Sequence, residues 1–164
     1  MAYQTYIGID NGVTGSIGVV GDTREPEFFI TPIKKSLNYT RKVSWTNRID
    51  TVKLLEILSS YSNSFVMIER PFVNPKMFKA SASALRAMEA SIIVFEQLGI
   101  PYQFIDSKKW QSAMLGEGLK GSKALKLASL QTGVRLFPQF EDMFIKQKDA
   151  DGMLIAEWGR RTKF

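Results

Sequence analysis

The stretch that decides the fold is Thr5-Tyr-Ile-Gly-Ile-Asp10-Asn-Gly-Val-Thr-Gly-Ser16-Ile-Gly-Val-Val20. Two apolar segments, 5–10 and 16–20, flank the turn dipeptide Asn11-Gly12, a pattern typical of two antiparallel strands. Residues 27–31 follow a second turn and predict a third strand. The chain therefore begins with an antiparallel three-stranded unit.

The rest of the chain alternates predicted helices with predicted strands. The polar, basic segment 34–48 is interpreted as a loop. Strands joined by helical crossovers predict an α/β domain with a mixed sheet and helices on its faces. A length of 164 residues without internal repeats favours one domain over 1–164. We expect helices over 50–60, 81–98, 107–115, 123–132 and 151–161, and strands over 65–68 and 102–105.

The composition excludes several chemistries. The chain has no cysteine and no histidine, so disulfides, thiolate metal sites and catalysis through histidine are all excluded. Apolar runs such as 92–95 are far too short to span a bilayer. The N-terminal residues lack the basic and apolar regions of a secretory signal. We therefore expect a protein that is not secreted, acting in the cytoplasm of a bacterium or phage-infected host, or in an organelle or nucleoid.

Positive charge is concentrated in three stretches of the sequence. The net charge is +6, and the segments 34–48 and 70–86 contain no acidic residue, while 107–127 contains only Glu117. Aromatic residues lie within all three, and aromatic rings among cations suit stacking on unpaired bases beside phosphates. A solvated basic face with its aromatics in the core is the alternative, but three such stretches together favour a polyanion. The aromatics are Tyr39, Trp45, Phe72, Phe78 and Trp110.

Four carboxylates stand where apolar segments begin or end. Asp10 and Glu69 each end an apolar strand, and Asp149 and Asp151 precede the apolar side chains of the last helix. A carboxylate at the edge of a buried sheet loses hydration unless it is paired or holds a cation. Oxygen ligands without histidine or cysteine favour Mg²⁺ or Mn²⁺. The sequence thus indicates a divalent-metal site.

Each carboxylate also has a simpler interpretation. Asp10 can be a turn residue before Asn11-Gly12, and Glu69 can pair with Arg70. Asp149 can cap the last helix, and Asp151 can interact with the dipole of its first turn. The shared position of the four at segment ends favours the metal site.

Four motifs, in order, resemble those of RuvC-type Holliday-junction resolvases, including their phage and organellar relatives. Residues 7–18, with Asp10, resemble the first hairpin of that family, and Val66-Met-Ile-Glu69-Arg-Pro-Phe72 is similar to its second acidic strand. Residues 108–123 are similar to its basic stretch, and Asp149-Ala-Asp151-Gly-Met-Leu-Ile-Ala156 is similar to its C-terminal acidic helix. The resemblance covers nearly the whole chain, and the ordered set is more specific than any single motif.

The resemblance implies a ribonuclease H-like fold: a five-stranded mixed sheet, its first three strands antiparallel, with helices on both faces. It further implies a Mg²⁺-dependent endonuclease that binds a four-way DNA junction as a homodimer and nicks two symmetric strands. The implied catalytic carboxylates, which are also the implied metal ligands, are Asp10, Glu69, Asp149 and Asp151.

The spacing of the last two acids departs from the family. The family usually places them three or four residues apart, on one helical face, whereas Asp149 and Asp151 are two apart. Asp149 can join the site only if it lies just before the helix. Glu141 and Asp142 are the reserve candidates for the fourth ligand.

The expected mechanism uses two Mg²⁺ ions per active site, with Mn²⁺ as a possible substitute. We expect Asp10 to bridge the ions, with Glu69 and Asp151 on either side, and Lys120 or Lys123 to contact the scissile phosphate; the alternative for either lysine is a generic phosphate contact. Phe72 or Phe78 is expected to stack at the junction centre, or else to lie in a dimer interface, for which helix 81–98 is the candidate. The expected DNA-binding residues are Arg70, Phe72, Lys76, Phe78, Lys79, Lys108, Lys109, Lys120 and Lys123.

Three other functions fit parts of the pattern. Actin-like ATPases share the opening Gly-x-Asp-x-Gly-x-Thr motif, but they generally need two such domains. An RNA-processing nuclease of the same fold would carry the same carboxylates. A non-cleaving DNA-binding relative would account for the spacing of Asp149 and Asp151.

Overall fold

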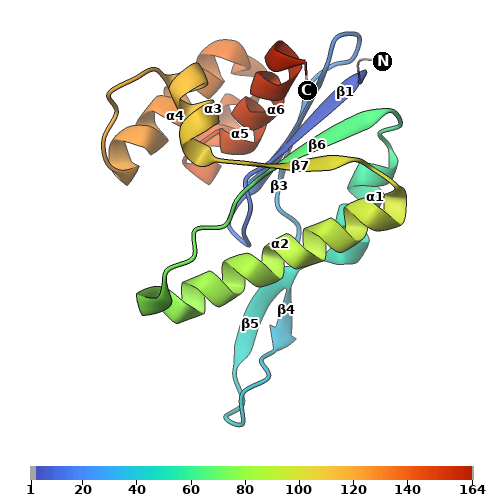
Figure 1. The fold of residues 1–164 in the computed structure, drawn as a ribbon, viewed down its shortest axis with the longest axis vertical. Helices are drawn as coiled ribbons and strands as arrows, with labels where there is room; N and C mark the ends of the chain where they lie inside the picture. Colours follow the sequence, from blue (N-terminus) through green and yellow to red (C-terminus); the bar gives the residue numbers. More distant parts are fainter. Residues whose placement is uncertain (1–2, 164) are drawn as a thin grey trace.

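The fold is built on a five-stranded mixed sheet, as expected from the sequence. A computed structural model describes residues 3–163. The strands lie in the order β3-β2-β1-β6-β7, with β1, β2 and β3 antiparallel and with β6 and β7 parallel to β1 (Figure 1). The strands are β1 (Thr5–Ile9), β2 (Ser16–Gly21), β3 (Glu27–Ile30), β6 (Ser64–Glu69) and β7 (Tyr102–Ile105).

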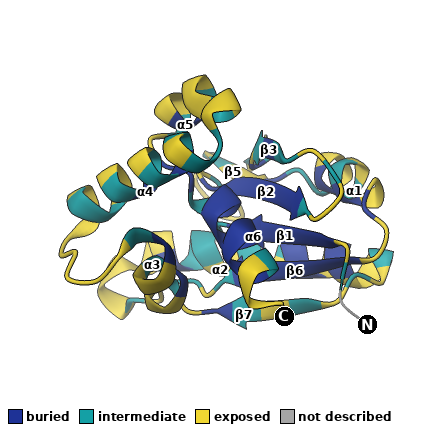
Figure 2. Ribbon diagram, turned by 90° about the horizontal axis from the view of Figure 1, so that it is seen from above, coloured by how far each residue is buried: buried dark blue, intermediate teal, exposed yellow. Residues whose placement is uncertain are grey.

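Helices cover both faces of this sheet, and the alternation of side chains along β1 explains why. Tyr6 packs into the core beneath the C-terminal helix α6, whereas Ile7 and Ile9 pack into the core beneath α1 and α2. Figure 2 shows α6 as a buried helix lying over the central strands. The helices are α1 (Thr51–Ser59), α2 (Phe78–Leu98), α3 (Ser107–Leu115), α4 (Ser122–Leu136), α5 (Glu141–Gln147) and α6 (Asp151–Thr162), with short 3-10 turns at Pro75–Met77 and Pro138–Phe140.

Two glycines let α6 lie directly on the sheet. Gly8 and Gly18 are opposite each other on β1 and β2. A Cβ on Gly8 would lie 2.3 Å from the backbone nitrogen of Ala156, and one on Gly18 would lie 2.3 Å from the Cα of Met153. Only glycine permits this approach, and the approach places the first turn of α6 against the start of β2 and the end of β1.

Gly18→Ala is therefore expected to destabilise the protein by about 2–4 kcal/mol, because the new methyl group meets backbone that no rotamer change can move. A urea-unfolding series measures this. Gly118→Ala is the comparison: Gly118 has φ 83 with open space around it, so its loss should cost only about 1 kcal/mol of left-handed backbone strain. Equal midpoints for Gly18→Ala and wild type would contradict the packing argument.

The structure corrects the expected elements in five places. Residues 34–48 are not a loop: β4 (Ile33–Leu37) and β5 (Trp45–Ile49) form an antiparallel hairpin. α5 was not expected, α2 begins three residues earlier than expected, and α4 continues to Leu136. The residue that caps α4 is Gly121 rather than Ser122.

Two expected helix ends are confirmed. The Asp50 side chain accepts a hydrogen bond from the Lys53 amide at the start of α1, and Gly99 ends α2 in the left-handed conformation. Among the described residues, no helix combines the length and apolar character needed to cross a membrane.

Candidate metal centre

Asp10 directly follows β1, at the edge of the sheet where the parallel strands end. Its amide donates a hydrogen bond of 3.0 Å to the carbonyl of Ser16, which closes the turn between β1 and β2. The next residue, Asn11, donates from Nδ2 to the carbonyl of Ala84 in α2 over 3.1 Å. The turn that carries Asp10 is thus fixed to the sheet on one side and to a helix on the other.

Glu69 reaches the same edge because β6 runs parallel to β1, with Ile68 opposite Ile9. The indole Nε1 of Trp110 donates a hydrogen bond of 3.0 Å to its Oε1. Trp110 is completely buried, so the core interpretation holds for this aromatic and it is not available for stacking on a base. Its function in the fold is to hold the Glu69 carboxylate.

Asp149 lies just before α6. This is the position that Asp149 needs in order to join the site, because it is only two residues from Asp151. α5 ends at Gln147, the next residue, Lys148, adopts the left-handed conformation with φ 72, and α6 begins at Asp151. The chain reverses at Lys148 and turns Asp149 inward, leaving only 4 % of that residue exposed. A carboxylate oxygen of Asp149 accepts from the amide of Asp151 at 3.4 Å, so helix geometry does not separate the two side chains.

Ser129 of α4 connects the Asp149–Asp151 segment to the rest of the fold. Its hydroxyl donates to a carboxylate oxygen of Asp151 and accepts from the amide of Ala150 at 3.0 Å. On the other side, the amide of Gly152 donates to the hydroxyl of Ser16 at 3.1 Å. The first turn of α6 is therefore held between α4 and the start of β2.

Three carboxylates from two distant parts of the sequence converge. One oxygen from each of Asp10, Asp149 and Asp151 lies within 4.8 Å of the others. Glu69 lies outside this group of three but beside it, since its carboxylate is close enough for its charge to raise the pKa of Asp10. Glu141 and Asp142, the reserve candidates, lie in the first turn of α5 and are exposed.

The burial of this cluster changes the acidity of its members. Burial raises the pKa of Asp10 well above its usual range, and the charges of Asp151, Glu69 and Asp149 raise it further. Burial, followed by the charge of Asp149, raises the pKa of Asp151 to about 7. Burial also raises the pKa of Glu69 and of Asp149. The four carboxylates therefore cannot all be ionised near neutral pH without a compensating cation.

The donor set fits a hard divalent cation. It consists of carboxylate oxygens alone, which is the ligand chemistry that Mg²⁺ and Mn²⁺ prefer. The ammonium of Lys126 lies 3.9 Å from an oxygen of Asp149, but a single positive charge cannot balance four carboxylates. The cluster is thus compatible with divalent-metal binding.

Lys126 and Ser129 are the site neighbours that the sequence interpretation missed. Lys123, Lys126 and Ser129 are spaced by three residues on α4, a spacing that places them on one helical face and that would have identified both. Among residues 3–163, the lysines chosen from the sequence form no ion pair with the acidic cluster. Lys120 is exposed in the loop before α4, and Lys123 is exposed in its first turn.

Arg70 does not pair with Glu69. Its Nε lies 2.9 Å from a carboxylate oxygen of Asp106, and its guanidinium lies 5.5 Å from the ring centre of Phe104. The interpretation of Glu69 as half of a local ion pair is therefore wrong. Glu69 is left facing the acidic cluster.

The second and third basic stretches meet beside Glu69. Arg70, Phe72, Lys108 and Lys109 line one hollow of about 800 Å³ between the end of β6 and the start of α3. The chain then runs outward to the start of α2 (Figure 1), where Phe78 is 66 % exposed; Phe72 is 78 % exposed. The other expected DNA-binding residues of this segment, Lys76 and Lys79, are exposed as well.

Comparison with solved structures identifies the fold. Thermus thermophilus RuvC in complex with a Holliday junction substrate matches with a TM-score of 0.57 and 15% sequence identity, over 98% of this chain and 97% of that chain. A second Thermus thermophilus RuvC structure matches with a TM-score of 0.49 and 15% identity, over 96% of each chain. No protein-family model and no curated protein sequence matches. The fold is that of RuvC, which confirms the expected ribonuclease H-like sheet.

Proposed function

We propose that this chain is a single metal-dependent nuclease domain that nicks branched DNA, with the four-way junction as its substrate. The observation that carries the proposal is the meeting of Asp10, Asp149 and Asp151 within 4.8 Å at one sheet edge, next to Glu69. The exposed basic and aromatic surface beside that edge supports a nucleic-acid substrate. The shared fold with a RuvC structure that contains a Holliday junction substrate supports the branched form.

In this proposal, Asp10, Glu69, Asp149 and Asp151 hold two Mg²⁺ or Mn²⁺ ions. When bound, such ions activate water, neutralise charge on the phosphate and stabilise the leaving oxygen. The protein's own contribution is orientation. Trp110 holds Glu69 through its indole N–H, and Ser129 holds Asp151 through its hydroxyl. Both supporting groups are buried, so the ligands keep their positions before the substrate arrives.

The lysines of α4 and the preceding loop would contact the substrate phosphates. Lys126 already faces Asp149, and Lys120 and Lys123 are exposed in the preceding loop and in the first turn of α4. Arg70, Lys76, Lys79, Lys108 and Lys109 would bind backbone phosphates beyond the scissile bond, and Phe72 or Phe78 would stack on unpaired bases.

Lys123→Ala is expected to slow cleavage by about tenfold to a hundredfold, because it removes a cation near the charge that develops on the phosphate. Junction affinity should change by less than about threefold, since one phosphate contact is a small part of the total. Single-turnover nicking rates and equilibrium binding without divalent ions separate the two effects. Loss of affinity with an unchanged rate would reduce Lys123 to a positioning residue.

A homodimer is part of the proposal because a four-way junction offers two equivalent strands to a two-fold assembly. α2 is the proposed interface. Leu85 and Ile93 are 40% and 53% exposed on this helix, which leaves apolar surface for a second copy. Phe78, at its N-terminal end, serves either the interface or the junction centre.

The deciding experiment incubates the protein with a synthetic mobile four-way junction, with Mg²⁺, with Mn²⁺ and with neither. Paired nicks at symmetric positions that require a divalent ion support the proposal. Cleavage of structured RNA but not of the junction would instead identify an RNA-processing nuclease. Junction binding without nicks under every ion condition would identify a non-cleaving relative.

A further inference from the structure

The β4–β5 hairpin is separate from the central sheet and carries a high density of positive charge. It forms its own two-stranded sheet and projects beyond α2, away from α3 and α4 (Figure 1). Residues 32–49 contain no aspartate or glutamate. The cations of this hairpin are Lys34, Lys35, Arg41, Lys42 and Arg48, and all five are exposed.

The register of the hairpin places two of these cations directly opposite each other. Lys34 on β4 pairs with Arg48 on β5. Like charges in opposite positions destabilise an antiparallel pair, and an acidic residue at either position would relieve this. Within residues 3–163, neither side chain forms an ion pair. The arrangement lowers the stability of the hairpin and leaves both cations available to an external anion.

The opposite face and the tip of the hairpin carry exposed apolar and aromatic side chains. Leu37 and Trp45 are paired on that face and are 61% and 66% exposed, and Tyr39 at the tip is 82% exposed. Aromatic rings next to cations suit a nucleic-acid surface, where they contact sugars or unpaired bases.

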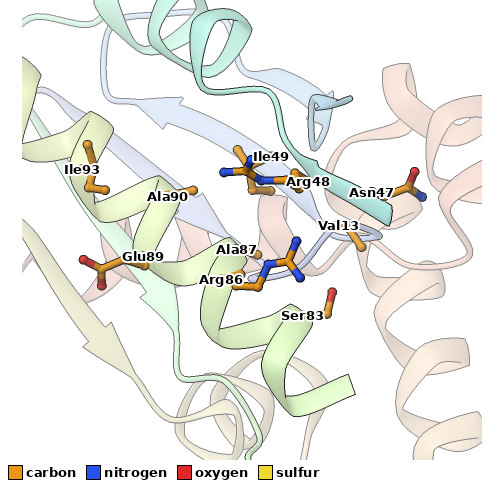
Figure 3. A pocket seen from close by; sticks show the side chains of 10 residues that line it. All are labelled: Val13, Asn47, Arg48, Ile49, Ser83, Arg86, Ala87, Glu89, Ala90 and Ile93. Carbon is orange, nitrogen blue, oxygen red and sulfur yellow. The ribbon is translucent and has the colours of Figure 1, made fainter. Parts of the chain in front are cut away.

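The hairpin adjoins the turn that carries the acidic cluster. A cavity of about 220 Å³ lies between β5 and α2, and Figure 3 shows the guanidinium groups of Arg48 and Arg86 at this cavity. Val13 lines the same cavity, and it belongs to the turn that follows Asp10. A DNA strand that runs from the carboxylates over this turn therefore reaches Arg48 and Arg86 first and then the rest of the hairpin.

We propose that the β4–β5 hairpin is a DNA-binding arm that contacts the sugar-phosphate backbone of a duplex arm of the substrate, outside the scissile region. Lys34, Arg48 and Arg86 bind its phosphates on one side of the hairpin, and Trp45 on the other face contacts its sugars, so that the bound DNA covers both faces. The inference rests on the proposed function and names where that substrate continues beyond the active site. A polyanion fits this surface better than a second copy of the chain does, because each copy carries a net charge of +6 and the hairpin offers no acidic group to a basic partner.

Charge removal tests the arm. Lys34→Gln combined with Arg48→Gln is expected to weaken junction binding about tenfold and to reduce the slope of log affinity against log salt by about two. Thermal stability should stay equal or rise, because the opposed charges are gone. The matched control, Lys53→Gln with Arg135→Gln, removes two exposed charges from α1 and α4 and should leave binding unchanged. If the wild-type protein binds the junction and the hairpin variant binds it with the same affinity, the proposed DNA-binding role of the hairpin is overturned, while the proposed function is not.

Tryptophan fluorescence gives an independent readout. The chain has three tryptophans; Trp110 and Trp158 are 0% and 4% exposed while Trp45 is 66% exposed, so acrylamide quenching reports mainly on the hairpin. Saturating junction DNA is expected to halve the quenching constant or reduce it further, and Trp45→Phe should abolish the change. Quenching that is unaffected by DNA, or that falls with protein concentration in its absence, would overturn the arm; the latter would identify a contact between copies. A wild-type protein that binds no junction would overturn the proposed function itself.

Discussion

Asp10→Asn is expected to abolish DNA cleavage while leaving junction binding intact. Asparagine keeps the shape of the side chain but removes the charge that Asp10 contributes at the centre of the acidic cluster. Metal-assisted stabilisation of a transition state amounts to several kcal/mol, and each 1.36 kcal/mol is a factor of ten in rate. The nicking rate should therefore fall by at least about a thousandfold, as measured in single-turnover assays against binding in the same buffer.

The same variant should be more stable than wild type when divalent ions are removed. Burial and three neighbouring carboxylates raise the pKa of Asp10, so its ionised form opposes folding near neutral pH. Asp50→Asn is the matched control, because Asp50 caps α1 outside the site and asparagine caps a helix as well as aspartate does. That control should cleave at the wild-type rate. Cleavage by Asp10→Asn at the wild-type rate would remove Asp10 from the active site.

The central sheet could be predicted because local and tertiary preferences agree there. In the stretch 5–20, two apolar segments flank a turn dipeptide, which predicts two antiparallel strands. The apolar run 65–68 is buried on both faces of the sheet. α2 could be predicted from its periodicity and from Gly99, which ends it in a left-handed conformation. The close approach of α6 to the sheet follows from Gly8 and Gly18, and only the packed structure shows it.

The hairpin and α5 could not be predicted for physical reasons. In β4 and β5, apolar Ile33, Leu37, Trp45 and Ile49 share one face, but the surrounding cations mask the alternation. α5 has seven residues, fewer than an isolated helix needs in water. It depends on the packing of Phe144, which is fully buried. The ring centroids of Phe144 and Phe28 lie 4.8 Å apart.

The acidic site was predictable in its members but not in its geometry. A carboxylate at the end of a buried strand identifies Asp10 and Glu69 from the sequence alone. The position of Asp149 depends on where α6 begins, which is decided by the left-handed conformation of Lys148. A lysine in the sequence does not predict that conformation. The spacing of Lys126 and Ser129 places them on one face of α4, but the contact of that face with Asp149 and Asp151 depends on the packing of α4 beside α6.

Divalent ions are expected to raise the thermal stability of the protein, and to raise it most at alkaline pH. At an ion concentration about a hundredfold above the dissociation constant, each bound ion stabilises the folded state by about 2.7 kcal/mol. For a domain of this size, that corresponds to a rise in Tm of about 5–10 °C. Melting curves with Mg²⁺ and with a chelator, from about pH 5 to about pH 8, measure the difference.

The sign of the pH dependence follows from the raised pKa of Asp151. This pKa is about 7 in the folded state and 3.8 in the ordinary carboxyl, so the folded state binds more protons between these values. The ion-free protein should therefore lose stability as pH rises from about 4 to about 7. With Mg²⁺ the carboxylates ionise to hold the ion, so the gap between the two Tm values widens over the same window. Asp10→Asn should narrow this gap and Asp50→Asn should not; an equal Tm with and without Mg²⁺ at every pH would show that the cluster holds no divalent ion.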